Sequence, residues 1–414
     1  MLRGRFFEFI NKGRGSRMQR KWYRLLLAFV FLLGLTACGS DEALFQEPEL
    51  PGKIAIITDE WNWNGSYTSA VSLVEKYGAE NVIHLTWSGW RDSEMLSFVE
   101  LIAQDPEIKV LIINPACFET DQIVSLLREQ RKDIFIIYVE YAILIDSDDF
   151  TNSVSMANLI LNANMHEVNR TIPMQAQKLG TETIISFSID PNSYSYPYGF
   201  YDSLEEYHMM RAISEEIGLN FVEVFRGEYE IQCGSSLSGY IERTLPGLIE
   251  KYGNDIVLVG LCSERLLWYS LSQGLIYPSS QTFLPSPYFI AQNLSIPALI
   301  EMEREEFFRK DNLAFIIGET RKELEERNLL GRISTWPVST CYMFAYVAVK
   351  YSIMWMNNEV PQEGIDIEVI EQIMVDFIAE STGEYEWGVG LVPLSHNSIV
   401  YPNYLLVFLD FMTY

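Results

Sequence analysis

The chain has 414 residues, of which 30 are Lys or Arg and 56 are Asp or Glu, so its formal net charge is −26. Hydrophobic residues make up 48% of the chain and aromatic residues 13%, a composition that excludes an intrinsically disordered protein. The acidic balance argues against nucleic acid as a partner, because binding phosphates requires clustered Lys and Arg.

The charge is distributed unevenly along the chain. Residues 1–37 contain eight cations and one acid, a net +7, whereas the rest holds 22 cations and 55 acids, a net −33. After Arg24 come eleven uncharged residues, 25–35, which is too few for a membrane-spanning helix of about 20 residues. A basic stretch followed by a short apolar one is typical of an export signal, so residues 1–37 are predicted to be a signal peptide.

The signal ends in Leu35-Thr36-Ala37-Cys38, which resembles the lipoprotein box of bacteria. This resemblance implies cleavage before Cys38 and attachment of lipid to its thiol. We therefore expect a protein of the cell membrane that is lipid-anchored, faces the extracytoplasmic side and does not span the bilayer. The alternative is a short uncleaved anchor with an incidental cysteine. Residues 38–51 are polar, contain two prolines and are interpreted as a tether.

From residue 52 onward, short apolar runs alternate with segments of helical spacing. We predict strands over 53–58, 81–87, 109–113, 133–139 and 158–163. We predict helices over 66–77, 92–104, 120–131 and 167–179. Repeated β-then-α units predict a parallel sheet with helices on both faces.

The same pattern then begins again. Strands are predicted over 183–189, 221–225 and 255–261, with helices over 204–217, 237–252 and 264–273. Further helices are predicted over 297–309, 322–330, 337–355 and 369–378, before an apolar, β-rich end over 387–414. The predicted fold class is therefore α/β, with two doubly wound parallel-sheet lobes. Lobe 1 would comprise residues 52–180 and 331–414, and lobe 2 residues 181–330.

The order of these elements resembles that of a type I periplasmic binding protein, the ligand-capturing subunit of ABC importers. Five segments carry the resemblance: Lys53–Asp59, Asn162–Asn164, Tyr201–Gly218, Leu261–Glu264 and Ser334–Pro337. It covers about residues 52–360 and leaves the longer tail unassigned. It implies a ligand cleft between the lobes, an ABC transporter permease as partner and no catalysis. Hinges are expected near 180–183 and 334–337, with a third crossing not located.

Ligands of open parallel sheets bind outside the carboxyl ends of the strands. Aromatic and polar side chains gather at those ends and in the return segment, and the candidate ligand contacts are Trp61, Asn62, Trp63, Asn64, Trp87, Trp90, Asn114, Phe118, Glu140, Asp190, Tyr194, Glu264 and Trp336. Rings on both sides of a cleft suit a flat or ring-shaped small molecule. The net charge of −33 after residue 37 disfavours an anionic ligand. Within the family that the chain resembles, the expected ligand is a nucleoside, a sugar or a flavin-like vitamin.

Patterns for catalysis and cofactors are weak. There is no phosphate-binding GxxxxGK[ST] loop, and none of the four histidines forms an HExxH pair. The acidic loop Asp146–Asp149 lacks the glycine that a calcium loop requires. We therefore expect no cofactor and no metal. No pair among Cys117, Cys233, Cys262 and Cys341 has CxxC spacing, and their disulfide state stays open.

Two alternatives to a transport receptor stay open. One is a receptor of the same fold that senses a ligand and signals to a membrane partner. The other is an exported hydrolase that uses the carboxylates of Glu140, Asp190 or Glu264, which would need two acids about 5–10 Å apart around a pocket.

Overall fold

The computed structural model describes most of the chain after residue 49. The described ranges are 50–60, 65–88, 92–116, 118–140, 150–189, 204–226, 237–253, 255–260, 282–283, 313–326, 330–331, 333–383 and 388–414. The predicted export signal and Cys38 lie outside these ranges, as do the predicted helices over 264–273 and 297–309.

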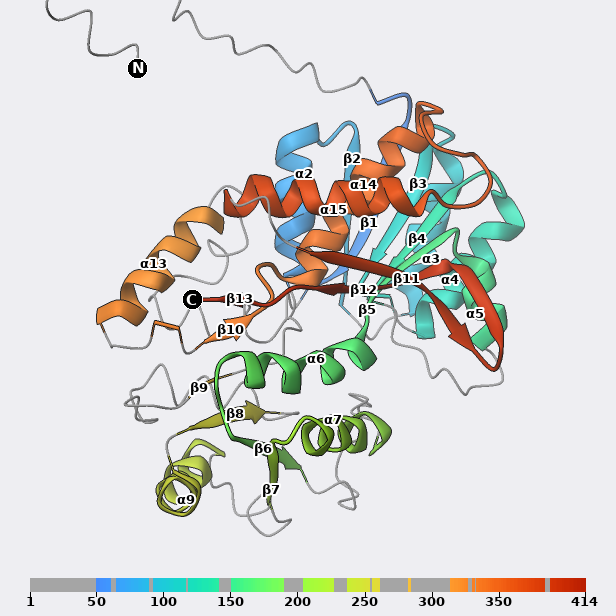
Figure 1. Ribbon diagram of the computed structural model, residues 1–414. Helices are drawn as coiled ribbons and strands as arrows, with labels where there is room; N and C mark the ends of the chain where they lie inside the picture. Colours follow the sequence, from blue (N-terminus) through green and yellow to red (C-terminus); the bar gives the residue numbers. More distant parts are fainter. Residues whose placement is uncertain are drawn as a thin grey trace, which may run out of the picture. The chain divides into compact units, whose positions relative to one another are not determined.

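The first sheet has seven strands in the order β11-β12-β5-β4-β3-β1-β2 (Figure 1). Its parallel part comprises β1 (Lys53–Asp59), β2 (Val82–Trp87), β3 (Ile108–Asn114), β4 (Phe135–Val139) and β5 (Leu159–Ala163). The structure contains all five predicted strands, each within two residues of the expected bounds. The order β2-β1-β3-β4-β5 is a doubly wound arrangement, in which ligand sites form at the carboxyl ends of the strands.

Helices cover both faces of this sheet. They are α2 (Ser66–Tyr77), α3 (Asp92–Gln104), α4 (Phe118–Gln130) and α5 (Phe150–Met156). Successive side chains of a strand point to opposite faces. Ile54 and Ile56 accordingly pack in one hydrophobic core with residues of α2, and Ala55 and Ile57 pack in another with residues of α3, α4 and α5. Burial on both faces explains why these strands are continuous apolar runs.

The second sheet has the order β7-β6-β8-β9, and its paired strands are all parallel. Its strands are β6 (Thr183–Ile189), β7 (Asn220–Arg226), β8 (Ile256–Gly260) and β9 (Thr282–Phe283), accompanied by α7 (Leu204–Glu216) and α9 (Leu237–Tyr252). Helix α6 (Met165–Lys178) leads from β5 into β6 and packs on α7. The predicted fold class, α/β with two parallel sheets, is confirmed. The exact boundaries of the two lobes stay a prediction.

The chain returns to the first sheet through α13 (Leu313–Glu326), β10 (Ser334–Thr335), α14 (Thr340–Met356) and α15 (Ile367–Thr382). The predicted bounds of three helices were wrong by more than two residues, and α15 ends at Thr382 rather than at the predicted 378. Helix α13 begins nine residues before the predicted 322, and α14 begins at Thr340 rather than at 337, because Pro337 and Val338 form a bend before the helix. Among the described helices, none combines the length and the apolar character needed to cross a membrane.

The tail beyond residue 360 completes the first sheet. Strand β12 (Ile399–Leu409) pairs in parallel with β5, and β11 (Val389–His396) pairs antiparallel with β12 at the edge. The last strand, β13 (Met412–Thr413), pairs antiparallel with β10. The part of the chain that the resemblance left unassigned is therefore built into the fold.

Strands β10 and β13 meet α6 at one buried junction. Gln175 Nε2 of α6 donates to Ser334 Oγ over 2.9 Å and to Thr413 Oγ1 over 3.2 Å, and the two hydroxyl oxygens lie 2.5 Å apart. The N–H of Tyr414 donates to the carbonyl of Ile333 over 2.9 Å. The segments after β5, before α14 and after β12 thus come together, and the last of these is a candidate for the third crossing.

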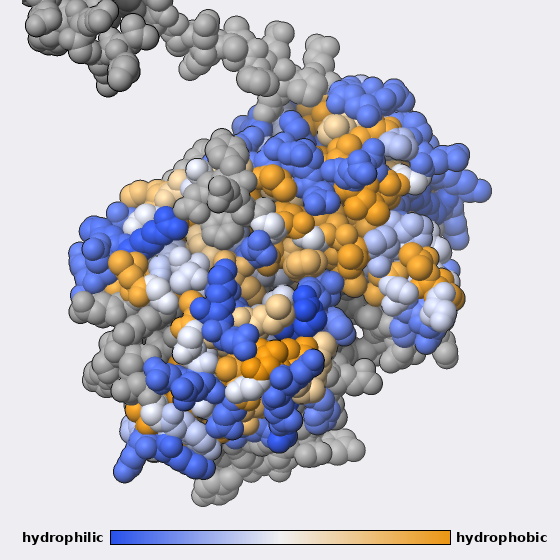
Figure 2. Space-filling view, in the orientation of Figure 1, coloured by the Kyte–Doolittle hydropathy of each residue, from blue (hydrophilic) through white to orange (hydrophobic). Residues whose placement is uncertain are grey.

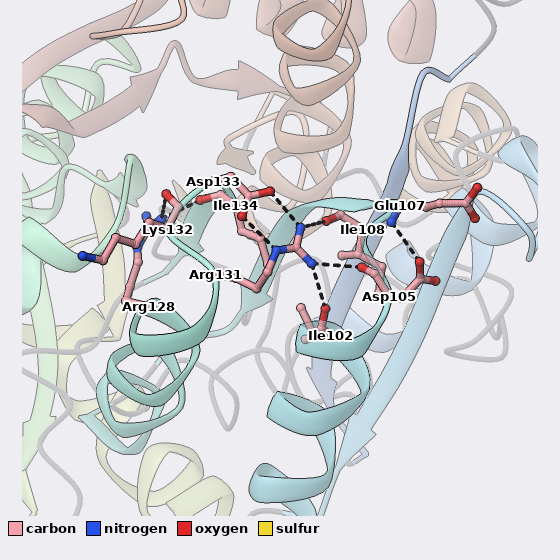
Figure 3. Close-up of polar contacts among 9 residues, drawn as sticks. All are labelled: Ile102, Asp105, Glu107, Ile108, Arg128, Arg131, Lys132, Asp133 and Ile134. Carbon is pink, nitrogen blue, oxygen red and sulfur yellow. Dashed lines mark hydrogen bonds and ion pairs between the residues drawn. The ribbon is translucent and has the colours of Figure 1, made fainter.

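The amino edge of the first sheet is closed by arginine side chains (Figure 3). Arg131 donates to the carbonyls of Asp105 (3.1 Å) and Ile108 (3.0 Å) and to the carboxylate of Asp133 (2.8 Å). Arg128 donates to the carbonyl of Ile134 over 2.7 Å. A guanidinium group can serve several acceptors at once, so these side chains satisfy backbone groups at the start of β3 and β4.

Candidate functional site at the carboxyl edge of the first sheet

Five of the predicted ligand contacts fall on described residues: Trp87, Asn114, Phe118, Glu140 and Trp336. Phe118 begins α4. The remaining predicted contacts, Trp61, Asn62, Trp63, Asn64, Trp90, Asp190, Tyr194 and Glu264, lie outside the described residues. Contact of any of them with a ligand stays a prediction.

Glu140 directly follows β4 in an unusual backbone conformation. Its φ angle is 50°, in the left-handed region, and the residue is only 4% exposed. For a residue with a Cβ atom, this backbone conformation costs about 1–2 kcal/mol of free energy. The N–H of Glu140 donates to the carbonyl of Leu161 over 2.9 Å, which fixes the residue against β5. Strain at a buried acidic residue is a feature that clusters at functional sites.

Asn114 is the last residue of β3, beside β4, and is fully buried. Its Nδ2 donates to the carbonyl oxygen of Cys341 over 3.1 Å, which connects the sheet to the first turn of α14. Its Oδ1 is buried and has no hydrogen-bond partner among the described residues. Asn114 therefore holds α14 against the sheet and keeps one acceptor available.

The amino end of α14 lies against the same edge. Cys341 is fully buried there, and burial raises the pKa of its thiol well above the usual range. The negative charges of Glu140 and Asp59 raise this pKa further. The thiol is therefore protonated at neutral pH, and both acids, at the ends of β4 and β1, lie close enough to influence it.

Tyr404 of β12 and Asn162 of β5 extend this group. Asn162 Nδ2 donates to the hydroxyl oxygen of Tyr404 over 2.8 Å. Burial raises the pKa of Tyr404 to about 12, and the charge of Glu140 acts in the same direction. We define the carboxyl-edge cluster as Asp59, Asn114, Glu140, Asn162, Cys341 and Tyr404.

Sequence reasoning selected only two members of this cluster, Asn114 and Glu140, because each directly marks the end of an apolar strand. Asp59 is likewise a polar residue at the end of an apolar strand, β1, and could have been selected by the same criterion. Tyr404 could not be found, because its position depends on the pairing of β12 with β5, two strands more than 200 residues apart in sequence. Cys341 similarly depends on how α14 docks on the sheet.

The two described tryptophans have different surroundings. Trp87 ends β2, is half-buried, and packs at the margin of the core formed with α3, α4 and α5. Trp336 is 1% exposed and packs inside the larger core, between β10 and α14. The ring of Trp336 thus contributes to the packing of the return segment.

Glu140 and Asn114 supply hydrogen-bond acceptors at this edge. A carboxylate and an amide oxygen accept hydrogen bonds, and hydroxyl or amino groups are their natural partners. Within the part of the chain that the structure describes, no three His, Cys, Asp or Glu side chains are placed to hold a metal ion.

Solved structures of similar fold place this architecture among known proteins. A proposed transcriptional regulator from Clostridium difficile 630 aligns with a TM-score of 0.67 at 16% identity, over 88% of this chain and 99% of that one. A sugar ABC transporter protein from Actinomyces odontolyticus ATCC 17982 aligns with a TM-score of 0.47 at 11% identity, over 77% and 88%. A substrate-binding protein of a sugar ABC transport system from Bordetella parapertussis 12822 aligns with a TM-score of 0.46 at 12% identity, over 88% and 89%.

At these sequence identities the similarity concerns the fold alone. It rests on the first alignment, because only that one of the three has a TM-score above 0.5. No curated protein sequence matches the chain. A family model described as "Protein of unknown function (DUF3798)" matches residues 53–333, about two thirds of the chain. The chain therefore belongs to the DUF3798 family.

Proposed function

We propose that this chain is a surface-tethered solute receptor. It would be a lipoprotein anchored through Cys38 on the extracytoplasmic side of the cell membrane. It would capture a small, ring-shaped ligand between its two lobes and deliver it to the permease of an ABC importer, without catalysis of its own.

The observation that carries this proposal is the strained Glu140 at the carboxyl edge of the first sheet. The residue is buried in a left-handed conformation beside the buried Asn114, at the edge where open α/β sheets bind their ligands. A fold that merely needed a turn after β4 would be more stable with glycine there. The strain is expected if the carboxylate must be held in one position for recognition.

The same two residues support a class of ligand. The carboxylate of Glu140 and Oδ1 of Asn114 both accept hydrogen bonds, so the ligand should present hydroxyl or amino groups at this edge. The net charge of −33 on the chain after residue 37 disfavours anions. A sugar, a nucleoside or a flavin-like vitamin meets both conditions.

Mass spectrometry of small molecules released from the purified, lipidated protein tests the proposal. We expect one compound with ring hydroxyl or amino groups in the wild type and at least tenfold lower occupancy in Glu140→Gln. Glu107→Gln is the matched control, because Glu107 is an exposed acid at the opposite edge, paired with Lys53. Equal occupancy in Glu140→Gln and the wild type would contradict the assignment of Glu140.

Trp63→Ala tests the predicted stacking contact in the same assay. A compound recovered at equal occupancy from this variant would remove stacking by Trp63 from the proposal. Recovery of an intact compound supports capture, whereas a cleaved compound would support the hydrolase. Uptake of the identified compound by cells that lack this chain should fall, and unchanged uptake would favour a sensing receptor.

A further inference from the structure

The burial of strand β5 is interrupted at a single residue, Asn162. The other residues of the strand are buried, whereas Asn162 is half-buried. It lies near the carboxyl end of β5, at the edge where open α/β sheets bind their ligands. Asn162 was not among the predicted ligand contacts, yet its amide is a polar group that can be reached at the same edge as Glu140.

The pairing of the strands places Asn162 between Glu140 and Tyr404. Val139, the last residue of β4, pairs with β5 one residue before Asn162, so Glu140 follows at the level of Asn162 on the neighbouring strand. On the other side of β5, Tyr404 of β12 pairs with Ile160, and residues two apart on a strand share a face. Tyr404 is therefore a diagonal neighbour of Asn162, within reach of a long side chain.

A hydrogen bond sets the orientation of the Asn162 amide. Its Nδ2 donates to the hydroxyl oxygen of Tyr404 over 2.8 Å. The negative charge of Glu140 acts on the same hydroxyl group, which favours an O–H that turns its hydrogen toward the carboxylate and its lone pairs toward Asn162. Since Nδ2 and Oδ1 of an amide point in different directions, holding Nδ2 on Tyr404 leaves Oδ1 facing away from the tyrosine.

Tyr404 is itself held in place by packing. The residue is 3% exposed, and the centroid of its ring lies 6.3 Å from that of Phe150 at the start of α5. Figure 2 shows a hydrophobic area over the β11–β12 part of the sheet. In apolar surroundings a polar group costs free energy unless it is hydrogen-bonded, so the bond to Asn162 is favoured. A ring fixed in this way can hold a second side chain in one orientation.

We propose that Oδ1 of Asn162 is a further ligand contact beside Glu140, and that Tyr404 is the positioning residue that orients it. This inference rests on the proposed function. Together with the carboxylate of Glu140 and Oδ1 of Asn114, the edge then presents three acceptors, which favours a compound with several hydroxyl or amino groups. The opposite orientation of the Asn162 amide would present a donor instead. Tyr404 therefore determines which chemistry the edge selects.

Binding of small molecules to the purified, lipidated chain tests this inference. D-ribose, adenosine and riboflavin serve as probes for the three proposed classes, and any compound recovered from the wild type by mass spectrometry joins them in the same calorimetric titrations. The variant is Tyr404→Phe, which keeps the ring and removes the hydroxyl group. The matched control is Tyr401→Phe, because the Tyr401 ring also packs on Phe150, with centroids 5.3 Å apart, and its hydroxyl lies 3.1 Å from Thr151 Oγ1.

We expect at least one of these compounds to bind the wild type and to bind Tyr404→Phe about tenfold more weakly, the size of one lost hydrogen bond. Tyr401→Phe should stay within about threefold of the wild type. In the Asn162→Ala background, Tyr404→Phe should weaken binding no further, whereas a purely structural role of the tyrosine would lower the affinity by the same factor in both backgrounds. Equal affinity of Tyr404→Phe and the wild type overturns the proposal, and so does an equal loss in both backgrounds or in both tyrosine variants.

The side-chain amide of Asn162 gives a spectroscopic readout that needs no added compound. In protein made with isotope-labelled asparagine, its nuclear magnetic resonance signal is assigned by its loss in Asn162→Ala. We expect slow hydrogen exchange of this amide in the wild type and in Tyr401→Phe, and fast exchange in Tyr404→Phe. Slow exchange in all three proteins would show that another group holds the amide, and it would overturn the role of Tyr404.

Failure of the receptor proposal has a different signature from failure of this inference. If none of the probes binds the wild type and no small molecule is recovered from it, the receptor and the contact of Asn162 are both wrong, whatever the amide signal shows. If a compound binds the wild type and Tyr404→Phe equally, the receptor proposal stands and only the positioning of Asn162 by Tyr404 is wrong.

Discussion

The two ends of the first sheet differ in how far their polar groups are hydrogen-bonded. At the amino edge, Arg131 and Arg128 donate to backbone carbonyls and to Asp133, so donors and acceptors satisfy each other. At the carboxyl edge, Glu140 is held in a strained conformation and Asn114 keeps a buried acceptor without a partner among the described residues. The arginine contacts at the amino edge stabilise the fold, whereas the backbone conformation of Glu140 at the carboxyl edge costs free energy of folding.

We expect this difference to separate fold stability from the proposed ligand binding along the same strands. Strand β4 begins directly after Ile134, whose carbonyl accepts from Arg128, and Glu140 directly follows its last residue, Val139. Substitutions at the amino edge should therefore change the free energy of unfolding and leave ligand occupancy intact. Substitutions at the carboxyl edge should instead lower ligand occupancy.

The largest expected effect is that of Arg131→Ala. Its side chain is 14% exposed, and its loss leaves several carbonyls at the start of β3 without a donor. Removing one partner of a buried hydrogen bond costs about 1–3 kcal/mol, so we expect a loss of about 3 kcal/mol in urea unfolding. The control is Arg211→Ala, whose side chain is 45% exposed and pairs with Glu215, with an expected loss below about 1 kcal/mol. Equal losses in the two variants would remove the distinction between the edges.

The second effect concerns pH. His84 of β2 lies with Nε2 2.8 Å from Thr58 Oγ1, and burial lowers its pKa from 6.5 to about 4. Between pH 6.5 and 4 the unfolded chain binds a proton at His84 that the folded chain does not, so stability falls as pH falls through this window. The contribution is about 2 kcal/mol after allowance for partial exposure. Urea unfolding of wild type and His84→Gln at pH 7 and pH 4 should show a smaller decrease in the variant, and parallel decreases would contradict the assignment.

A smaller and opposite effect is expected at the carboxyl edge. Glu140→Gly relieves the left-handed strain, which stabilises the folded state by about 1–2 kcal/mol. Part of this gain is lost, because glycine has greater conformational freedom in the unfolded chain. We expect a net gain of about 1 kcal/mol in denaturant unfolding, together with loss of ligand occupancy. A loss of stability would instead show that contacts of the Glu140 side chain hold this edge together.

The smallest effect is that of Asp133→Asn. Hydrogen bonding with Arg131 lowers the pKa of Asp133 to about 2, but the carboxylate is 55% exposed and solvent screens the pair. We expect a loss below about 1 kcal/mol at pH 7 in thermal unfolding, well below that of Arg131→Ala. A loss as large as that of Arg131→Ala would mean that the ion pair, rather than the capping of carbonyls, is what matters at the amino edge.

The sequence was most informative where structure is local. Strands buried on both faces are continuous apolar runs, so β1 and β3 were predicted almost to the residue. Helix α2 was predicted to end at Tyr77 because Gly78 follows, and Gly78 has a φ angle of 87° that favours glycine. The ends of these elements then identified Asn114 and Glu140 as candidate site residues.

What could not be predicted depends on contacts between distant segments. Strand β12 lies between β11 and β5, and nothing in its apolar sequence specifies β5 as a neighbour. The contribution of Tyr404 and Cys341 to the carboxyl-edge cluster follows from such pairings. The start of α14 was placed too early, because the apolar run continues through Pro337 and Val338, which form a bend.

The insertion of β12 next to β5 has a consequence for the timing of folding. A ribosome makes β5 more than 200 residues before the strand that covers its open side, and the junction of Gln175, Ser334 and Thr413 waits for the same late segment. The early strands therefore remain without their final neighbour during most of synthesis.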